Sequence, residues 1–222
     1  MCAYVLMKLL ESSPSRYDAG MEILTLGKDR VIKEMIATEM IRPGYRVLDL
    51  GSGTGTLAIL CAKRGAEVVA MDISRDMLRL ARSRASRNGV ESSITWLELG
   101  VLELDSRLRD GSFDAVAATF FFSELSREER MDALEVAWRK LKDGGVLIVL
   151  DEARPQSRLA RSLATMIRIP LLVIAWLVAQ ARTRPVSGIE SMLGRAGFKI
   201  ASQHRYLMGS LQLIVAVKEV DR

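Results

Sequence analysis

The stretch Val47–Thr56 (VLDLGSGTGT) joins a short apolar run to a segment with helical spacing. Gly51, Gly53 and Gly55 lack a Cβ, so backbone amides in this turn can approach a ligand, and the following helix offers its N-terminal amides. In doubly wound sheets, ligands bind at this edge, outside the carboxyl ends of the strands. The G-x-G-x-G spacing differs from the G-x-G-x-x-G of dinucleotide-binding turns. The stretch therefore predicts a cofactor turn between a strand and a helix.

Strands and helices are predicted to alternate around this turn. Apolar and β-branched runs predict strands at 46–50, 67–72, 94–97, 113–119 and 146–150, and helices at 28–40, 56–64, 75–88 and 127–141. This alternation indicates an α/β fold with a doubly wound parallel sheet and helices on both faces. The runs 198–202 and 211–217 have no helix between them and are expected to pair antiparallel. Before all of these elements, a short N-terminal helix is followed by Glu11–Tyr17, whose serines and proline predict a loop.

The length of 222 residues predicts a single domain over 1–222, with an N-terminal helical lid at 1–42 and an apolar insertion at about 152–188. Within the insertion, Ile169–Ala181 carries no charged residue. It is shorter than the roughly 20 apolar residues that cross a bilayer. Two interpretations remain: a buried helix or pocket lid, or a lipid-facing helix that gives peripheral membrane contact through 167–184.

Composition excludes several classes of protein. The net charge is +5, but the 32 Lys and Arg are spread along the chain among 27 acidic residues, which argues against a nucleic-acid partner. Two cysteines and one histidine make neither a disulfide framework nor a metal site. No basic segment precedes the apolar start of the chain, so we predict a cytoplasmic protein.

A second element of the cofactor site is Asp72, which ends the strand at 67–72, 17 positions after Gly55. A carboxylate at this place can accept hydrogen bonds from both hydroxyls of a ribose. Together with the glycine turn, it indicates a nucleoside-containing cofactor.

The segments VLDLGSGTG, VVAMDIS, GSFDAV and LKDGGVLIVLDE resemble, in order and spacing, the class I S-adenosylmethionine (SAM)-dependent methyltransferases over almost the whole chain. The resemblance implies a Rossmann-like, seven-stranded, mostly parallel sheet of order 3-2-1-4-5-7-6 with strand seven antiparallel. It implies SAM as the cofactor, with the three glycines around the methionine moiety, Asp72 on the ribose and Ile73 on the adenine. Further residues that the resemblance places at the cofactor are Asp49, Ser52, Met77 and Thr119.

Two details concern the ends of this cofactor site. Family members carry an acidic residue where this chain has Val101, so we expect the backbone of Val101 and Leu102 and apolar packing to hold the adenine, with Glu103 nearby. Arg16–Tyr17–Asp18 resembles the Tyr-Asp segment of quinone-biosynthesis C-methyltransferases, which folds over the cofactor. That resemblance places Tyr17 over the methyl-transfer site.

Methyl transfer from a sulfonium is an in-line displacement, so the protein mainly holds donor and acceptor close and aligned. A general base is needed only where the acceptor loses a proton. The candidates are Tyr17, Glu124 just past the strand at 113–119, and Glu152, next to Asp151, at the end of the strand at 146–150.

The acceptor is expected to be bulky or apolar, because Phe120–Phe122 and the apolar insertion supply hydrophobic walls. The chain resembles quinone-type C-methyltransferases and, more closely, corrinoid protein-associated methyltransferases, through its N-terminal MCAYVLMKLLESSPSRYDAG, FSEL, DEARP and IPL…AWLVAQARTRPV segments. The latter implies a corrinoid or corrinoid protein as acceptor, whose reduced cobalt needs no base. Two alternatives stay open: a membrane-associated quinone or lipid methyltransferase, and a non-catalytic SAM-binding protein that contacts a partner through 152–188.

Overall fold

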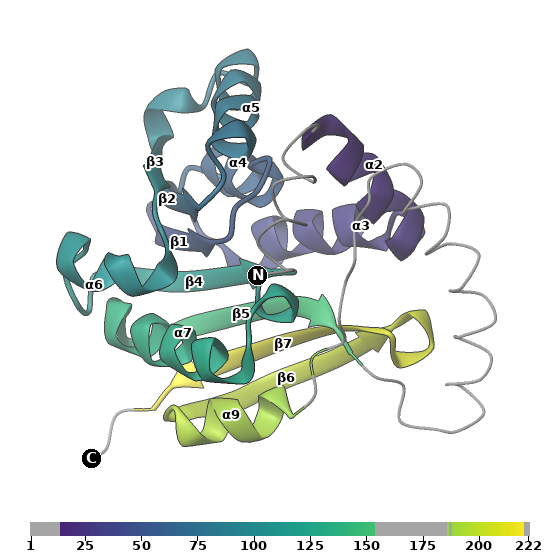
Figure 1. Ribbon diagram of the computed structural model, residues 1–222. Helices are drawn as coiled ribbons and strands as arrows, with labels where there is room; N and C mark the ends of the chain where they lie inside the picture. The colour runs from purple at the N-terminus through teal and green to yellow at the C-terminus, as the bar shows by residue number, and fades with distance from the viewer. Residues whose placement is uncertain (1–13, 154–185, 187, 220–222) are drawn as a thin grey trace.

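The computed structural model describes residues 14–153, 186 and 188–219, which form a seven-stranded sheet flanked by helices (Figure 1). The strand order is β3-β2-β1-β4-β5-β7-β6. β7 runs antiparallel to both β5 and β6, and the remaining neighbours are parallel. The predicted sheet order and the single antiparallel strand are confirmed. The strands are β1 (Arg46–Leu50), β2 (Glu67–Asp72), β3 (Ile94–Glu98), β4 (Phe113–Thr119), β5 (Leu141–Glu152), β6 (Phe198–Tyr206) and β7 (Leu211–Lys218).

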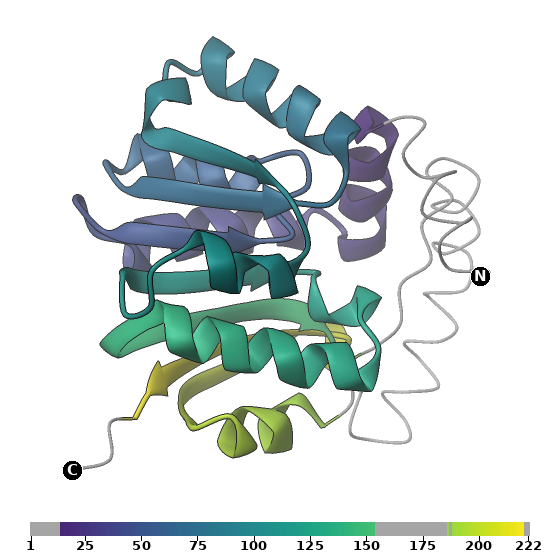
Figure 2. The same ribbon diagram turned by 60° about the vertical axis from the view of Figure 1, so that its left-hand side comes forward.

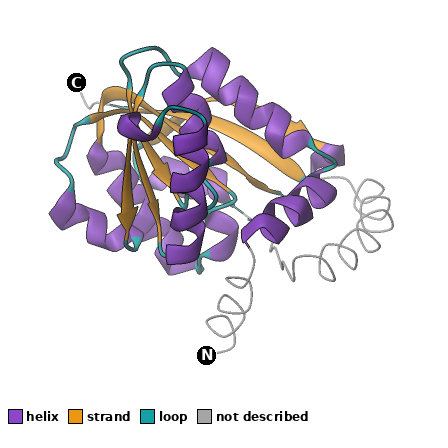
Figure 3. Ribbon diagram, turned by 90° about the horizontal axis from the view of Figure 1, so that it is seen from above, coloured by secondary structure: helices purple, strands orange, loops and turns teal. Residues whose placement is uncertain are grey.

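Helices cover both faces of the sheet (Figures 2 and 3). One face carries α2 (Pro14–Thr25), α3 (Lys28–Met35), the π-helical turn η1 (Ile36–Met40), α4 (Thr56–Lys63) and α5 (Arg75–Arg87). The other carries α6 (Leu104–Arg107), α7 (Arg127–Lys140) and α9 (Ile189–Arg195), and Figure 2 shows α7 and α9 in front of the strands. The short 3₁₀ turns are η2 (Glu91–Ser93), η3 (Val101–Glu103), η4 (Phe122–Glu124) and η5 (Leu207–Gly209).

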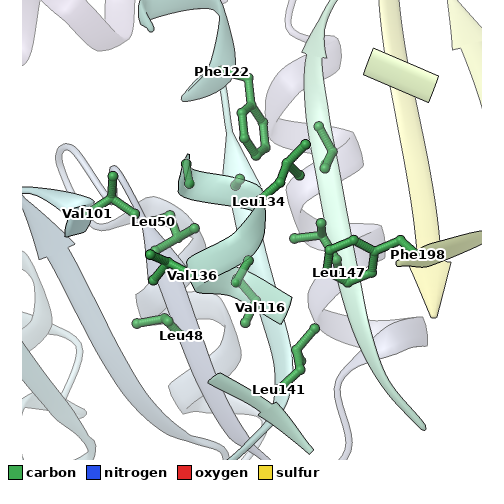
Figure 4. Close-up of a cluster of buried hydrophobic side chains, with 14 of the residues drawn as sticks. Leu48, Leu50, Val101, Val116, Phe122, Leu134, Val136, Leu141, Leu147 and Phe198 are labelled. Carbon is green, nitrogen blue, oxygen red and sulfur yellow. The ribbon is translucent and has the colours of Figure 1, made fainter. Parts of the chain in front are cut away.

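The alternation of side chains along β1 fixes the position of the glycine turn. Leu48 and Leu50 are fully buried on the α7 face, where they pack with Val116 and Leu134 (Figure 4). Val47 packs into the core on the opposite face. Burying a leucine contributes about 1.5–3 kcal/mol, and a one-residue slip would turn these side chains to the wrong face. The register of β1, and with it the start of the turn at Gly51, is therefore strongly determined.

Several predicted boundaries differ from the structure. The loop predicted at Glu11–Tyr17 is wrong from residue 14 onward, because α2 begins at Pro14. Proline is well suited to the first turn of a helix, where its missing N–H costs no hydrogen bond. The predicted helix over 28–40 is α-helical to Met35 and π-helical from Ile36.

Two strands are longer than their apolar runs. β5 already begins at Leu141, which pairs with Phe113, and its register shifts before Val146 pairs with Ala115. The intervening Gly144 has a left-handed φ of 72°, so the predicted turn residues form an irregularity inside the strand. β6 extends to Tyr206 and includes His204.

Some predictions concern segments outside the described residues. The first 13 residues of the lid and most of the insertion at 152–188, including the stretch 167–184, belong to them. Among the helices that the structure does describe, none is long and apolar enough to cross a bilayer.

Candidate functional site

A cavity of about 260 Å³ lies at the carboxyl ends of β1, β2 and β4. Five elements build it: helices α2 and α3, the glycine turn after β1, the turn between β2 and α5, and the segment that follows β4. Its lining residues are Tyr17, Asp18, Met21, Glu22, Asp29, Arg30, Lys33, Gly51, Ser52, Gly53, Thr54, Thr56, Leu57, Asp72, Ile73, Ser74, Met77, Thr119, Phe120, Phe121 and Glu124.

The three glycines of the turn all have left-handed φ angles, of 65° at Gly51, 52° at Gly53 and 78° at Gly55. Their surroundings differ. A Cβ on Gly53 would meet no atom within 4 Å, whereas a Cβ on Gly55 would lie 2.8 Å from Trp96 and 2.9 Å from Ala81. Gly53 therefore leaves open space at the cavity, and Gly55 permits close packing of the turn on β3 and α5.

Asp72 lines the cavity, where two backbone amides hold its carboxylate. The N–H groups of Gly53 and Ser74 donate to its two oxygens at 2.8 Å each. Ser74 in turn caps α5 by accepting from the Met77 amide at 3.3 Å. The carboxylate is thus fixed beside the glycine turn, where it can accept further hydrogen bonds from the hydroxyls of a ligand.

Asp49 is a buried carboxyl behind the same turn, with 1% of its surface exposed. It points to the face on which Val47 is buried, toward α3 and α4. Neither of its oxygens has a hydrogen bond of normal geometry to any described residue, although the Ala58 amide is near. Burial raises the pKa of Asp49 to about 7, and the positive charge of Lys33 acts in the opposite direction.

Helix α2 is tied to the glycine turn through Asp18. This carboxylate accepts a hydrogen bond from the Thr54 hydroxyl at 2.8 Å and pairs with the Arg84 guanidinium of α5 at 2.5 Å. The tie places Tyr17 in the cavity wall. Burial, followed by the charge of Glu124, raises the pKa of Tyr17 well above its usual range, so the phenol keeps its proton.

The segment after β4 carries Glu124 into the cavity. Phe120 has a left-handed φ of 56° and its amide donates to the Leu150 carbonyl at 2.7 Å, so the chain turns sharply at the strand end. The next turn is held by Asp151, which accepts from the Ser123 amide at 3.0 Å. These contacts place Phe120, Phe121 and Glu124 at the cavity that the glycine turn also lines, whereas Phe122 is buried in the core of the α7 face.

The carboxyl group of Glu124 is open to solvent through the cavity but surrounded by protein on its other sides. This partial burial raises its pKa to about 7, and the charges of Asp72 and Asp151 act in the same direction. A group with this pKa can take up a proton at neutral pH.

Nine of the residues predicted for the site line this cavity: Tyr17, Gly51, Ser52, Gly53, Asp72, Ile73, Met77, Thr119 and Glu124. Five do not: Asp49, Gly55, Val101, Leu102 and Glu152.

The residues predicted at the adenine and at the end of β5 have other surroundings. Val101 is buried in the core of the α7 face, and Leu102 is 56% exposed. The Glu103 carboxylate accepts from the Gly100 amide at 3.0 Å, which caps η3. Glu152 is buried at the end of β5, where its carbonyl accepts from the Val186 amide at 2.9 Å. Contact of Val101 and Leu102 with adenine stays a prediction.

Sequence reasoning missed Lys33 and the partners of Asp18. Lys33 is four residues after Asp29 on α3, and in sequence this spacing looks like an ordinary surface ion pair. Thr54 and Arg84 are separated from Asp18 by 36 and 66 positions. No local sequence pattern predicts contacts between residues so far apart in the chain.

Comparison with known proteins agrees with this geometry. A family model described as "Methyltransferase domain" matches residues 47–145. The demethylmenaquinone methyltransferase of Symbiobacterium thermophilum is 28% identical over 95% of this chain and 91% of its own length. The ubiquinone/menaquinone biosynthesis C-methyltransferase of Pseudomonas savastanoi pv. phaseolicola is 30% identical over 95% of this chain and 88% of its own.

The solved structures support the fold. Geranyl diphosphate C-methyltransferase from Streptomyces coelicolor, in complex with Mg²⁺, geranyl diphosphate and S-adenosylhomocysteine, superposes with a TM-score of 0.64. The superposition covers 85% of this chain and 78% of that one, at 14% sequence identity.

Proposed function

Because the chain belongs to the class I SAM-dependent methyltransferases, within which it resembles the quinone-biosynthesis C-methyltransferases, we propose that it methylates an apolar aromatic acceptor of the quinol type, with Glu124 as the general base. One observation carries the proposal. The Glu124 carboxyl, with a pKa of about 7, lines the same cavity as the glycine turn and Asp72.

The described residues fit SAM as the cofactor. Gly53 leaves open space at the turn, and the Asp72 carboxylate is held beside it by two amides. When bound, SAM supplies an electrophilic methyl group on a sulfonium. Since SAM supplies the methyl group, the choice of acceptor depends on the cavity wall formed by the segment after β4.

Phe120 and Phe121 give this wall an apolar, aromatic surface, and the ring of Phe121 packs edge to face on Phe122 at 5.5 Å between centroids. Such a surface suits a planar ring that carries few polar groups. Tyr17, which stays protonated, can donate a hydrogen bond to an oxygen of that ring.

Glu124 supplies what a quinol-type acceptor requires. A phenolic ring becomes a strong carbon nucleophile when its hydroxyl proton leaves, and a carboxylate with a pKa near 7 accepts that proton at neutral pH. A carbon–carbon bond to the methyl group then forms as the carbon–sulfur bond breaks. The ring carbon loses its hydrogen, the phenol is restored, and the whole reaction releases one proton.

A corrinoid acceptor makes a different demand on the site. Reduced cobalt is a nucleophile without a proton to lose, so Glu124 would be dispensable. The corrinoid acceptor, a corrinoid protein as partner, peripheral membrane contact through 167–184 and a non-catalytic partner role remain predictions.

The deciding experiment offers SAM labelled in its methyl group to the purified protein, with a demethylated quinol or with a reduced corrinoid protein as acceptor. We expect label in the quinol ring carbon, identified by mass spectrometry. Glu124→Gln should lower kcat by roughly 10²–10⁴-fold and remove an acid limb near pH 7 from the rate profile. Glu128→Gln, on the exposed side of α7, is the matched control.

Each other outcome points to another function. Label in the corrinoid with an unaffected Glu124→Gln variant would show the corrinoid reaction. Binding of S-adenosylhomocysteine with no labelled product from either acceptor would favour the non-catalytic role.

A further inference from the structure

Lys33 is a cation that lines the cavity but has no contact with the glycine turn among those described above. Its side chain is 15% exposed, and its ammonium group lies 5.6 Å from the centre of the Phe120 ring. The nearest acid that forms an ion pair with it within the described part of the chain is Asp29, at 3.8 Å. That distance is longer than a hydrogen bond, so the donors of Lys33 have capacity left for a ligand.

The other cavity cation on α3 differs from Lys33 in each respect. The Arg30 side chain is 73% exposed, and its guanidinium donates to Glu34 on the same helix at 3.2 Å. A charge in that position is screened by water and already paired. Of the two cations among the described residues that line the cavity, Lys33 is therefore the one that is both sheltered and available.

Asp49 provides a complementary charge on the same side of the glycine turn. It is buried, its oxygens make no hydrogen bond of normal geometry to any described residue although the Ala58 amide is near, and Lys33 is close enough for its charge to act on it. A sheltered ammonium and a buried carboxyl beside one cavity match a ligand group that bears both charges. The methionine end of SAM is such a zwitterion, with an α-ammonium and an α-carboxylate.

We propose that Lys33 binds the α-carboxylate of the methionine moiety of SAM. Asp49, which is buried behind the glycine turn and does not line the cavity, contributes a negative charge on the side of the α-ammonium without touching it. Lys33 thereby makes the site selective for cofactors that retain this carboxylate. The assignment rests on the cofactor and is independent of the acceptor.

The test compares two ligands by isothermal titration calorimetry, neither of which undergoes turnover. S-adenosylhomocysteine carries both charges, and its decarboxylated counterpart lacks only the carboxylate. The wild-type protein should prefer the former by roughly ten- to hundredfold, as for a hydrogen bond to a charged group. Equal affinity of the wild-type protein for both ligands would overturn the proposal without any variant.

Lys33→Met should remove most of this preference by weakening S-adenosylhomocysteine alone, and Lys33→Arg should restore it. Lys28→Met, which removes an exposed charge from the same helix, is the matched control and should leave both affinities unchanged. A role confined to neutralising Asp49 predicts something different: Lys33→Met would weaken both ligands equally and lower the melting temperature of the free protein. That pattern would refute carboxylate binding.

Discussion

Alanine at Gly53 and at Gly55 should separate the two tasks of the glycine turn. Both residues have a left-handed φ, but only Gly55 is closely packed, against Trp96 and Ala81. The Gly53 position faces open space at the cavity. We expect Gly55→Ala to damage mainly the fold and Gly53→Ala to damage mainly cofactor binding.

The magnitudes follow from the two environments. A left-handed backbone costs an alanine about 1–2 kcal/mol at either position. At Gly55 the new Cβ would also lie under 3 Å from two side chains, and such overpacking adds roughly 1–3 kcal/mol. The two costs together come to about 2–5 kcal/mol for Gly55→Ala. Since 1 kcal/mol shifts the melting temperature of a protein of this size by about 2–4 °C, Gly55→Ala should melt roughly 4–20 °C below wild type, and Gly53→Ala roughly 2–8 °C below.

The assay combines thermal unfolding of the free protein with calorimetric titration of S-adenosylhomocysteine. Gly53→Ala should lose at least about tenfold in affinity, because its Cβ occupies space that the ligand uses. Folded Gly55→Ala should lose less affinity than Gly53→Ala. Equal stability of the two variants, or a greater loss of affinity in Gly55→Ala, would refute this division of tasks.

Three further substitutions test the surroundings of the cavity. Asp49→Asn should raise the free energy of unfolding relative to wild type, and this difference should grow from pH 5 to pH 8, to at most about 4 kcal/mol. The reason is that the Asp49 carboxyl of the wild-type protein releases its proton near pH 4 when unfolded but keeps it until about pH 7 when folded; a pH-independent difference in urea unfolding would contradict the raised pKa. Asp18→Asn should speed amide hydrogen exchange in α2, measured by mass spectrometry, because it removes the charge that pairs with Arg84; unchanged exchange would show that packing alone holds the helix. Lys218→Met removes the hydrogen bond to the Leu141 carbonyl and should cost roughly 1–3 kcal/mol in urea unfolding. The affinity for S-adenosylhomocysteine should be unchanged, because Val217 pairs with Val146 and Lys218 therefore lies near the amino ends of the parallel strands, at the opposite edge of the sheet from the cavity; lost affinity would reveal coupling between the two regions.

The core of the fold could be predicted from the sequence because its signals are local. The apolar runs of β1, β2 and β4 are short, continuous and followed by helices, so their direction and neighbours are restricted. Predictions failed where a local signal had two meanings. Pro14 punctuates a loop as readily as it opens a helix, and Gly144 marks a turn as readily as an irregular strand.

The site was only partly predictable, for a different reason. Asp72 is the last residue of β2, and Glu124 comes shortly after β4. The carboxyl ends of parallel strands meet at one edge of the sheet, so both side chains lie at one cavity. Lys33 and Asp18 reach the cavity from helices that pack above this edge. Their positions depend on how those helices dock, which no pattern within the helices specifies.

The position of Glu124 in the cavity bears on the identity of the acceptor. In the sequence, Glu124 is one acid among many, so no base stands out and a cobalt nucleophile that needs none is attractive. In the structure, the same carboxyl lines the cavity together with Phe120 and Tyr17, and its partial burial and two neighbouring carboxylates raise its pKa to about 7. Holding a partly ionised carboxyl in such surroundings costs stability, a cost that an acceptor without an ionisable proton would not require. The geometry therefore favours an acceptor that gives up a proton, and the Glu124→Gln rate profile is the measurement that distinguishes the two chemistries.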